Sequence, residues 1–240
     1  AILAVVVLYW SKLWPFHRKR IPQRSWFAQQ STNGFVGGLQ RFGDRYCCMD
    51  KIVMWLKIAV SCLPAMLIGL PLNDWLDKHF YNPTVVALML LLYGAGFLFV
   101  ERYNRSRKPR VNSIASLRWS DALLIGVFQV LALIPGTSRS GATILGGILI
   151  GTSREVAAEY TFFLAVPVMF GASLLKIVRF GTISGTELGV LLVGMAVAFG
   201  VSILAIRFLM GYIRKHDFTA FGWYRIGLGL LVLLYFYVIR

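Results

Sequence analysis

The chain has 240 residues, 58% of them hydrophobic, and its mean hydropathy of +0.68 is far above that of a soluble domain. Its formal net charge is +15, but the basic residues stand in short loops between apolar runs, which is the pattern that sets membrane topology. The composition therefore predicts an all-α polytopic membrane bundle and excludes a soluble fold. The charge pattern predicts contact with anionic lipid headgroups and argues against nucleic acid as a partner.

Several apolar segments have about the 20 residues that a membrane span requires. Residues 1–10 resemble only the end of a span, which predicts that an earlier part of the protein is missing. Residues 11–50 are predicted to form a basic loop, and residues 73–83 a short loop with few bases. In chain order, the other expected spans are 51–72, 84–100, 155–178, 187–209 and 220–239, all within one integral membrane domain of residues 1–240.

Residues 121–151 are also apolar, but PGTSRSG interrupts them at 135–141. The pieces on either side of the interruption are too short to cross a bilayer. Two short apolar pieces around a Gly/Pro break predict a re-entrant helix–loop–helix hairpin that enters and leaves by the same face. The alternative is a single span kinked at Pro135.

The distribution of basic residues bears on these two interpretations. Base-rich loops alternate with base-poor ones, the former at 11–50, 101–120 and 210–219 and the latter at 73–83 and 179–186. This alternation holds only if residues 121–151 return to the face from which they start. The positive-inside rule therefore favours the hairpin, and it predicts cytoplasmic basic loops and an external C-terminus.

Arg139 stands at the centre of the interruption, and an arginine at membrane depth costs about 2.5–3.5 kcal/mol on insertion scales. One candidate partner is Glu159, either in a salt bridge to Arg139 or as a second functional carboxylate. The other candidate is a ligand anion. A planar guanidinium matches phosphate oxygens, and the helix that follows Ser140 points its N-terminal amides back at the loop.

Small and hydroxyl-bearing residues surround Arg139 and suit an anion, because glycines let backbone N–H groups approach a ligand and hydroxyls donate hydrogen bonds. The predicted cradle comprises Gly136, Thr137, Ser138, Ser140, Gly141 and Thr143. Gln129, half a helix before the loop, either supports the cradle or bonds to a neighbouring helix. A nucleotide-binding P-loop is not indicated, because Ala142 replaces its lysine and no strand precedes the loop. His17, His79 and His216 all lie in predicted loops away from the cradle.

The segment 133–172, LIPGTSRSGATILGGILIGTSREVAAEYTFFLAVPVMFGA, closely resembles the undecaprenyl-diphosphatase family, also called the bacitracin-resistance proteins. PGTSRSGAT is similar to the second signature of that family, and FGWYRIGLGLLVLL resembles its final helix. AILAVVVLYW resembles the tail of an early family helix. The resemblance covers nearly the whole chain, and the loop at about 17–50 is its least similar part.

The resemblance implies a multi-pass enzyme of the bacterial inner membrane that hydrolyses undecaprenyl diphosphate to undecaprenyl phosphate. This reaction recycles the lipid carrier of peptidoglycan synthesis and confers bacitracin resistance. The resemblance also implies two re-entrant hairpins in an inverted repeat and an active site that opens to the outer, periplasmic face. Arg139 would hold the diphosphate, with Ser138 as a further catalytic residue. The family also suggests a divalent cation, Mg²⁺ or Ca²⁺, as a cofactor. A homodimer is compatible with the resemblance but is not implied by it.

One family signature is not found in the chain, namely closely spaced glutamates followed by a Pro–Ser–Ser–Thr–Gly–His-like loop. That signature carries the proposed nucleophilic serine and the metal-associated glutamates. The resemblance therefore predicts an incomplete first repeat and only the phosphate-binding half of the active site. The alternative function is a polyprenyl-phosphate transporter or a non-catalytic lipid-phosphate binder, because secondary transporters also hold anions between broken helices.

Overall fold

The computed structural model describes residues 1–15, 49–179 and 185–239. These residues are almost entirely helical and contain no strand, which confirms the all-α class. Five of their helices are long and apolar enough to cross a membrane, over Asp50–Gly69, Pro83–Asn104, Arg154–Leu174, Glu187–Lys215 and Thr219–Val238. The basic loop predicted at 11–50 lies mostly outside the described residues.

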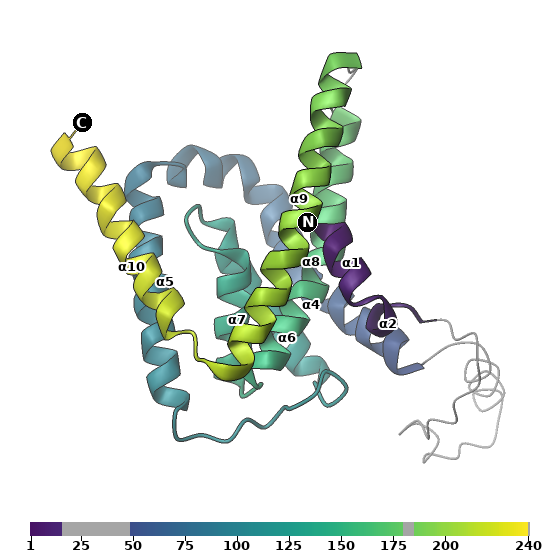
Figure 1. Cartoon of the computed structure of the whole chain (residues 1–240). Coiled ribbons are helices and arrows are strands. Elements are labelled where there is room, and N and C mark those ends of the chain that lie inside the picture. The colour runs from purple at the N-terminus through teal and green to yellow at the C-terminus, as the bar shows by residue number, and fades with distance from the viewer. Residues whose placement is uncertain (16–48, 180–184, 240) are drawn as a thin grey trace, which may run out of the picture.

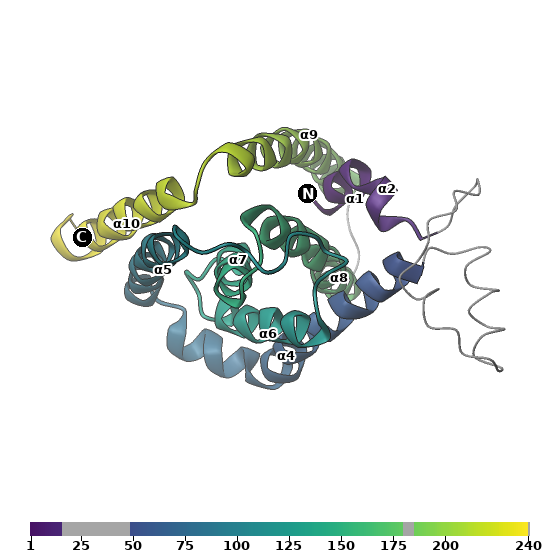
Figure 2. The ribbon, with the colours of Figure 1, turned by 90° about the horizontal axis from the view of Figure 1, so that it is seen from below.

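The helices form a central group with a pair of helices on either side (Figure 1). In chain order they are α1 (Ile2–Leu8), α2 (Trp10–Leu13), α4 (Met49–Phe80), α5 (Pro83–Asn104), α6 (Trp119–Val130), η2 (Leu131–Leu133), α7 (Arg139–Ile150), α8 (Arg154–Arg179), α9 (Gly185–Lys215), α10 (Thr219–Leu234) and η3 (Tyr235–Ile239). α6 and α7 lie in the centre and contact α4 and α8, as the view from below in Figure 2 shows. α5 pairs with α10, and α1 packs against α8 and α9.

The loop predicted at 73–83 is wrong, because α4 continues as a helix to Phe80 and bends across the bundle (Figure 1). Pro64 and Pro71 lie inside the helix without ending it. The ring of His79 stabilises the last turn of α4. It stacks on the Trp75 ring with 4.7 Å between the centroids, and its Nδ1 hydrogen-bonds to the Trp75 carbonyl at 2.8 Å. The chain then reverses at once, because Asn82 caps α5 by accepting a hydrogen bond from the Val85 amide.

Residues 121–151 form two short helices, α6 and α7, whose outer ends are joined on one face of the bundle. The amide of Val111 donates to the Gly151 carbonyl at 3.1 Å, and the Ser153 amide donates back to the Val111 carbonyl at 2.9 Å. The Arg110 side chain bonds to Asp121 in the first turn of α6 at 2.7 Å. Because one connecting segment holds the start of α6 and the end of α7, the hairpin enters and leaves by the same face.

An ion pair with a buried carboxylate ties the same face of the bundle to α5 and α10. Glu101, only 5% exposed near the end of α5, accepts hydrogen bonds from the Arg154 guanidinium at the start of α8. The same carboxylate accepts a hydrogen bond from the backbone amide of Phe218, directly before α10, at 3.1 Å. The pair therefore sets where α10 leaves this face relative to the hairpin.

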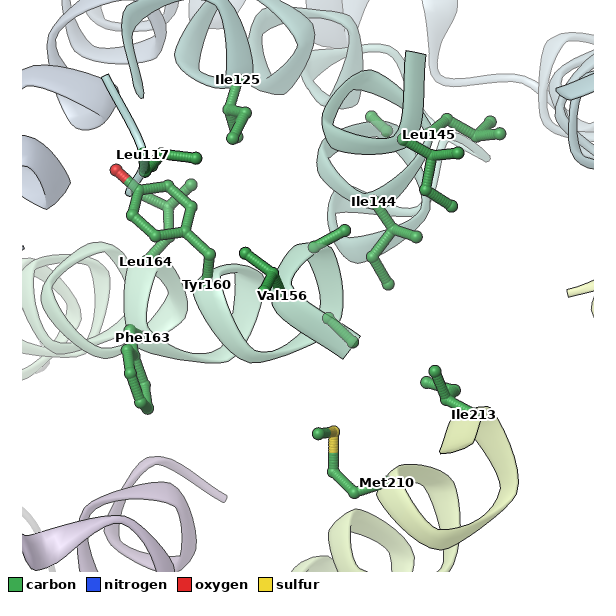
Figure 3. Packing of buried hydrophobic residues seen from close by; sticks show 14 of the residues in the cluster. Leu117, Ile125, Ile144, Leu145, Val156, Tyr160, Phe163, Leu164, Met210 and Ile213 are labelled. Carbon is green, nitrogen blue, oxygen red and sulfur yellow. The ribbon is translucent and has the colours of Figure 1, made fainter. Parts of the chain in front are cut away.

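The core of the described chain lies where α8 packs against the hairpin (Figure 3). Tyr160 and Phe163 are fully buried and point to different sides of α8, Tyr160 toward Leu117 and Phe163 toward α1. The Tyr160 hydroxyl pairs with Ser61 of α4 at 2.7 Å, so its polar atom is satisfied inside an apolar core. These contacts hold α8 between α4 and α1.

The tip of the hairpin packs against α5 through a glycine. Gly136 has φ +89°, and a Cβ at this position would lie 2.6 Å from the Val86 backbone. The close approach of two backbones is therefore a reason for glycine at this position that does not depend on the predicted cradle.

We expect Gly136→Ala to lower the free energy of unfolding by about 2 kcal/mol or more, because it combines a strained φ with a backbone clash. Thermal unfolding in detergent measures the loss. Gly200→Ala is the matched control, since a Cβ at Gly200 of α9 meets nothing within 4 Å. Equal unfolding temperatures for the two variants would contradict the expectation.

Candidate functional site

The interrupted segment ends in the N-terminus of α7, which the chain caps with its own hydroxyls. Ser138 is the N-cap residue, and its Oγ accepts a hydrogen bond from the Gly141 amide at 3.2 Å. The Ser140 hydroxyl lies 3.1 Å from that of Ser138. The positive end of the α7 dipole and a cluster of hydroxyls thus meet at the predicted cradle, which is a favourable place for an anion.

Thr143 lies beside Arg139 as predicted for the cradle, but its hydroxyl already has partners inside the protein. It is 1% exposed, donates to the Arg139 carbonyl at 3.0 Å and accepts from the Thr161 hydroxyl of α8 at 2.9 Å. Thr143 therefore fixes the first turn of α7 to α8 rather than offering a free donor. Thr161 was not singled out from the sequence, since a lone threonine in an apolar helix gives no distinctive signal.

Arg139 lines a cavity of about 240 Å³ between the hairpin, α8, α9 and α1. Ser140, Thr143, Thr161 and Gln129 line the same cavity. Gln129 is 3% exposed, and its Oε1 has no hydrogen-bond partner within the part of the chain that the structure describes. A buried amide oxygen without a partner is costly, so Gln129 fits a site that binds a hydrogen-bonding group better than it fits a purely structural position.

Arg139 forms no salt bridge with any carboxylate of residues 1–15, 49–179 or 185–239. The buried carboxylates have other partners, since Glu101 binds Arg154 and Asp121 binds Arg110. An arginine held at membrane depth without a carboxylate is expected to bind an anionic ligand.

The salt bridge between Arg139 and Glu159, one of the alternatives left open by the sequence, does not form in the structure. Glu159 is 7% exposed and accepts a hydrogen bond from Lys12 of α2 at 2.5 Å. Both residues line a separate cavity of about 470 Å³ beside the start of α8. Because Glu159 lies two residues before Thr161 on the same helix, it faces a different direction from the cavity of Arg139. Glu159 is therefore an interhelical salt-bridge residue in this structure.

A second arginine, Arg225 of α10, lies against the same helix N-terminus. Its Nη2 is 3.2 Å from where a Gly141 Cβ would stand, so the missing side chain of Gly141 makes room for the guanidinium. Its Nη1 is buried without a hydrogen-bond partner among the described residues, and the group lies 5.8 Å from the Phe97 ring centroid. Arg225 was not predicted as a site residue, although a charged residue inside the apolar segment 220–239 is a sequence signal that could have identified it. Its neighbours Trp223 and Tyr224 are exposed, as interfacial anchors would be.

The described residues around this site offer hydroxyls, one amide and two guanidinium groups. They bring together no group of three His, Cys, Asp or Glu side chains within 1–15, 49–179 and 185–239. Mg²⁺ and Ca²⁺ prefer carboxylate oxygens, so these side chains suit an anion and do not by themselves fit a divalent cation. Ser138 bonds to Ser140 and to the α7 backbone, and no general base among the described residues hydrogen-bonds to its hydroxyl.

The fold and the site define a polytopic α-helical membrane protein with a re-entrant hairpin whose inner helix end carries an arginine. The model of the bacitracin resistance protein BacA family matches residues 1–231. The chain is 53% identical to an undecaprenyl-diphosphatase of Acetivibrio thermocellus, with 100% of this chain and 80% of the relative covered. It is 52% identical to that of Desulfitobacterium hafniense, over 98% and 77% of the two chains, and 49% identical to that of Enterococcus faecalis, over 98% and 78%. The chain belongs to the BacA family.

Proposed function

We propose that the chain hydrolyses undecaprenyl diphosphate to undecaprenyl phosphate and inorganic phosphate, and that Arg139 and Arg225 hold the diphosphate. The relatives cited above are named for this activity. The observation that supports the assignment is Arg139, which lines the cavity at the N-terminus of α7 without a carboxylate partner in the described chain, while Arg225 lies against Gly141 of the same helix end. This arrangement offers a doubly charged group several donors inside a low-dielectric site.

The reaction transfers the terminal phosphoryl group to water. The bond between the β-phosphorus and the bridging oxygen breaks, a bond from the water oxygen to that phosphorus forms, and the bridging oxygen stays on undecaprenyl phosphate. Negative charge shifts toward the bridging oxygen as the bond lengthens, and guanidinium groups placed there stabilise the transition state. Arg139 and Arg225 would supply this charge, while Ser138 and Ser140 would orient the phosphate oxygens.

We propose that the enzyme lies in the bacterial inner membrane with the joined ends of the hairpin toward the cytoplasm. The positive-inside rule supports this orientation, because the connecting segment at the hairpin base contains Arg105, Arg107, Lys108 and Arg110. The tip reaches α5 at Val86, one turn from the opposite end of that helix. The site would then take the lipid headgroup from the periplasmic face.

Release of inorganic phosphate from undecaprenyl diphosphate by the purified full-length protein in detergent tests the proposed function. We expect multiple turnovers with undecaprenyl phosphate as the other product, seen by mass spectrometry. Binding of the lipid without release of phosphate would overturn hydrolysis and favour the lipid-phosphate binder considered above. The transporter alternative gains no support from the relatives, which are named as diphosphatases.

A further inference from the structure

A second cavity begins at the other side of the same loop. It encloses about 350 Å³ between α5, the end of α6 and α7. Leu92, Gly96 and Phe99 of α5 form one wall, and Leu145 and Leu149 of α7 form the facing wall. This volume lies in the range of small-molecule pockets, although almost every lining side chain is apolar. We call this cavity the α5–α7 groove.

The α5–α7 groove is polar at only one end, which is the end formed by the interrupted loop. Thr137 and Ile134 of the loop line it there together with Tyr93, and the buried Thr137 hydroxyl has no hydrogen-bond partner among the described residues. Thr137 is followed directly by Ser138 and Arg139, which belong to the candidate anion site. The groove therefore begins beside the loop at Thr137, on a different face of α7 from the cavity that Arg139 lines, and it is apolar away from the loop.

The opposite side of the α5–α7 groove is open to the surroundings of the bundle. Leu92 and Phe99 are 63% and 68% exposed, and Leu149 is 43% exposed. In a membrane protein these side chains face the acyl chains. An apolar chain that begins at the loop can therefore leave the groove sideways into the bilayer.

We infer that the α5–α7 groove binds the prenyl units next to the diphosphate of the lipid substrate. This inference rests on the proposed function and names a subsite for it. A chain attached to a diphosphate that is held at the loop and by Arg225 enters the groove at high effective concentration, whereas a free acyl chain must compete for it. The volume suits the first few prenyl units, and the remainder of the tail stays in the bilayer. Selectivity for a polyprenyl tail thus arises beside the headgroup.

Filling the groove tests the inference. A Cβ at Gly96 would lie 3.6 Å from Leu145 Cδ1 and meet nothing else within 4 Å, so the backbone admits a side chain that projects into the groove. We expect Gly96→Leu to raise KM for undecaprenyl diphosphate roughly tenfold, the equivalent of about two methylenes losing contact. Hydrolysis of dimethylallyl diphosphate, whose single prenyl unit ends near the loop, should keep its kcat/KM. Gly200→Leu on exposed α9 is the matched control.

A crosslinking experiment tests the location without catalysis. A farnesyl phosphate that carries a benzophenone at the end of its tail should label α5 or α7 near Leu92 and Leu149, and Gly96→Leu should abolish this labelling. Three results would overturn the tail subsite. They are an unchanged KM of Gly96→Leu for undecaprenyl diphosphate, an equal loss of kcat/KM for both substrates, and labelling found only on helices other than α5 and α7. Failure of the unmodified protein to release phosphate from either substrate would instead overturn the proposed function.

Discussion

Replacing Arg139 with alanine is expected to reduce kcat/KM for undecaprenyl diphosphate by at least about a hundredfold, which is the scale for removing one donor to a developing oxyanion. The reason is that Arg139 lines the cavity together with Gln129 and Ser140 and has no carboxylate partner within the described chain. Initial rates of phosphate release in detergent measure the effect, and a lipid-binding assay shows how much of it is lost affinity.

The lysine variant of the same residue separates charge from geometry. Arg139→Lys should also be impaired, because a point charge cannot reproduce the two-pronged contact of a guanidinium with phosphate oxygens. Arg207→Ala is the control, since Arg207 lies exposed on α9 and lines no cavity with Arg139. Near-normal turnover by Arg139→Ala would remove this residue from the proposed mechanism.

The second large effect is expected at Arg225. Its guanidinium carbon lies 5.8 Å from the Phe97 ring centroid, and truncation to alanine would remove the length of the side chain as well as its charge. Arg225→Met keeps a long stem and removes the charge alone. We expect this variant to unfold at nearly the wild-type temperature while its kcat/KM falls by about a hundredfold.

Two measurements on Arg225→Met therefore decide between two roles. If Arg225 binds the diphosphate, Arg225→Met loses activity while its unfolding temperature stays unchanged. Arg225→Lys then has part of the wild-type activity, because it keeps a positive charge. If Arg225 only fills space between α5 and α10, the methionine variant keeps its activity. The latter result would leave Arg139 as the one arginine of the proposed site.

The sequence predicted the features that depend on local pattern. The break at PGTSRSG contains two glycines and a proline, and the apolar pieces that flank it are too short to span a membrane. The free-energy cost of placing Arg139 at membrane depth predicted, from the sequence alone, that an anion binds there. These signals stay within about thirty residues of chain, where helix length and turn chemistry decide the outcome.

Features that depend on contacts between distant helices were missed or mistaken. Lys12 is 147 residues from its partner Glu159, and the choice of Lys12 over Arg139 as that partner follows from how α2 meets α8. Arg225 reaches the hairpin because α10 crosses α5 at glycines, with the Gly94 backbone 3.0 Å from a Cβ at Gly222. The extension of α4 to Phe80 was missed because prolines and acidic residues suggest a loop even where the chain remains helical. None of these arrangements has a local signature.

The joined base of the hairpin has a consequence for how turnover responds to lipid asymmetry. α7 has 12 residues, so about 18 Å of packed helix separates Arg139 from the strap of hydrogen bonds at Val111 and Gly151. A carrier whose headgroup lies in the leaflet beside that strap cannot present its phosphates to Arg139 without crossing the bilayer. In sealed vesicles the rate would therefore follow the amount of lipid in the opposite leaflet rather than the total, and transbilayer movement of the carrier would become the limiting supply.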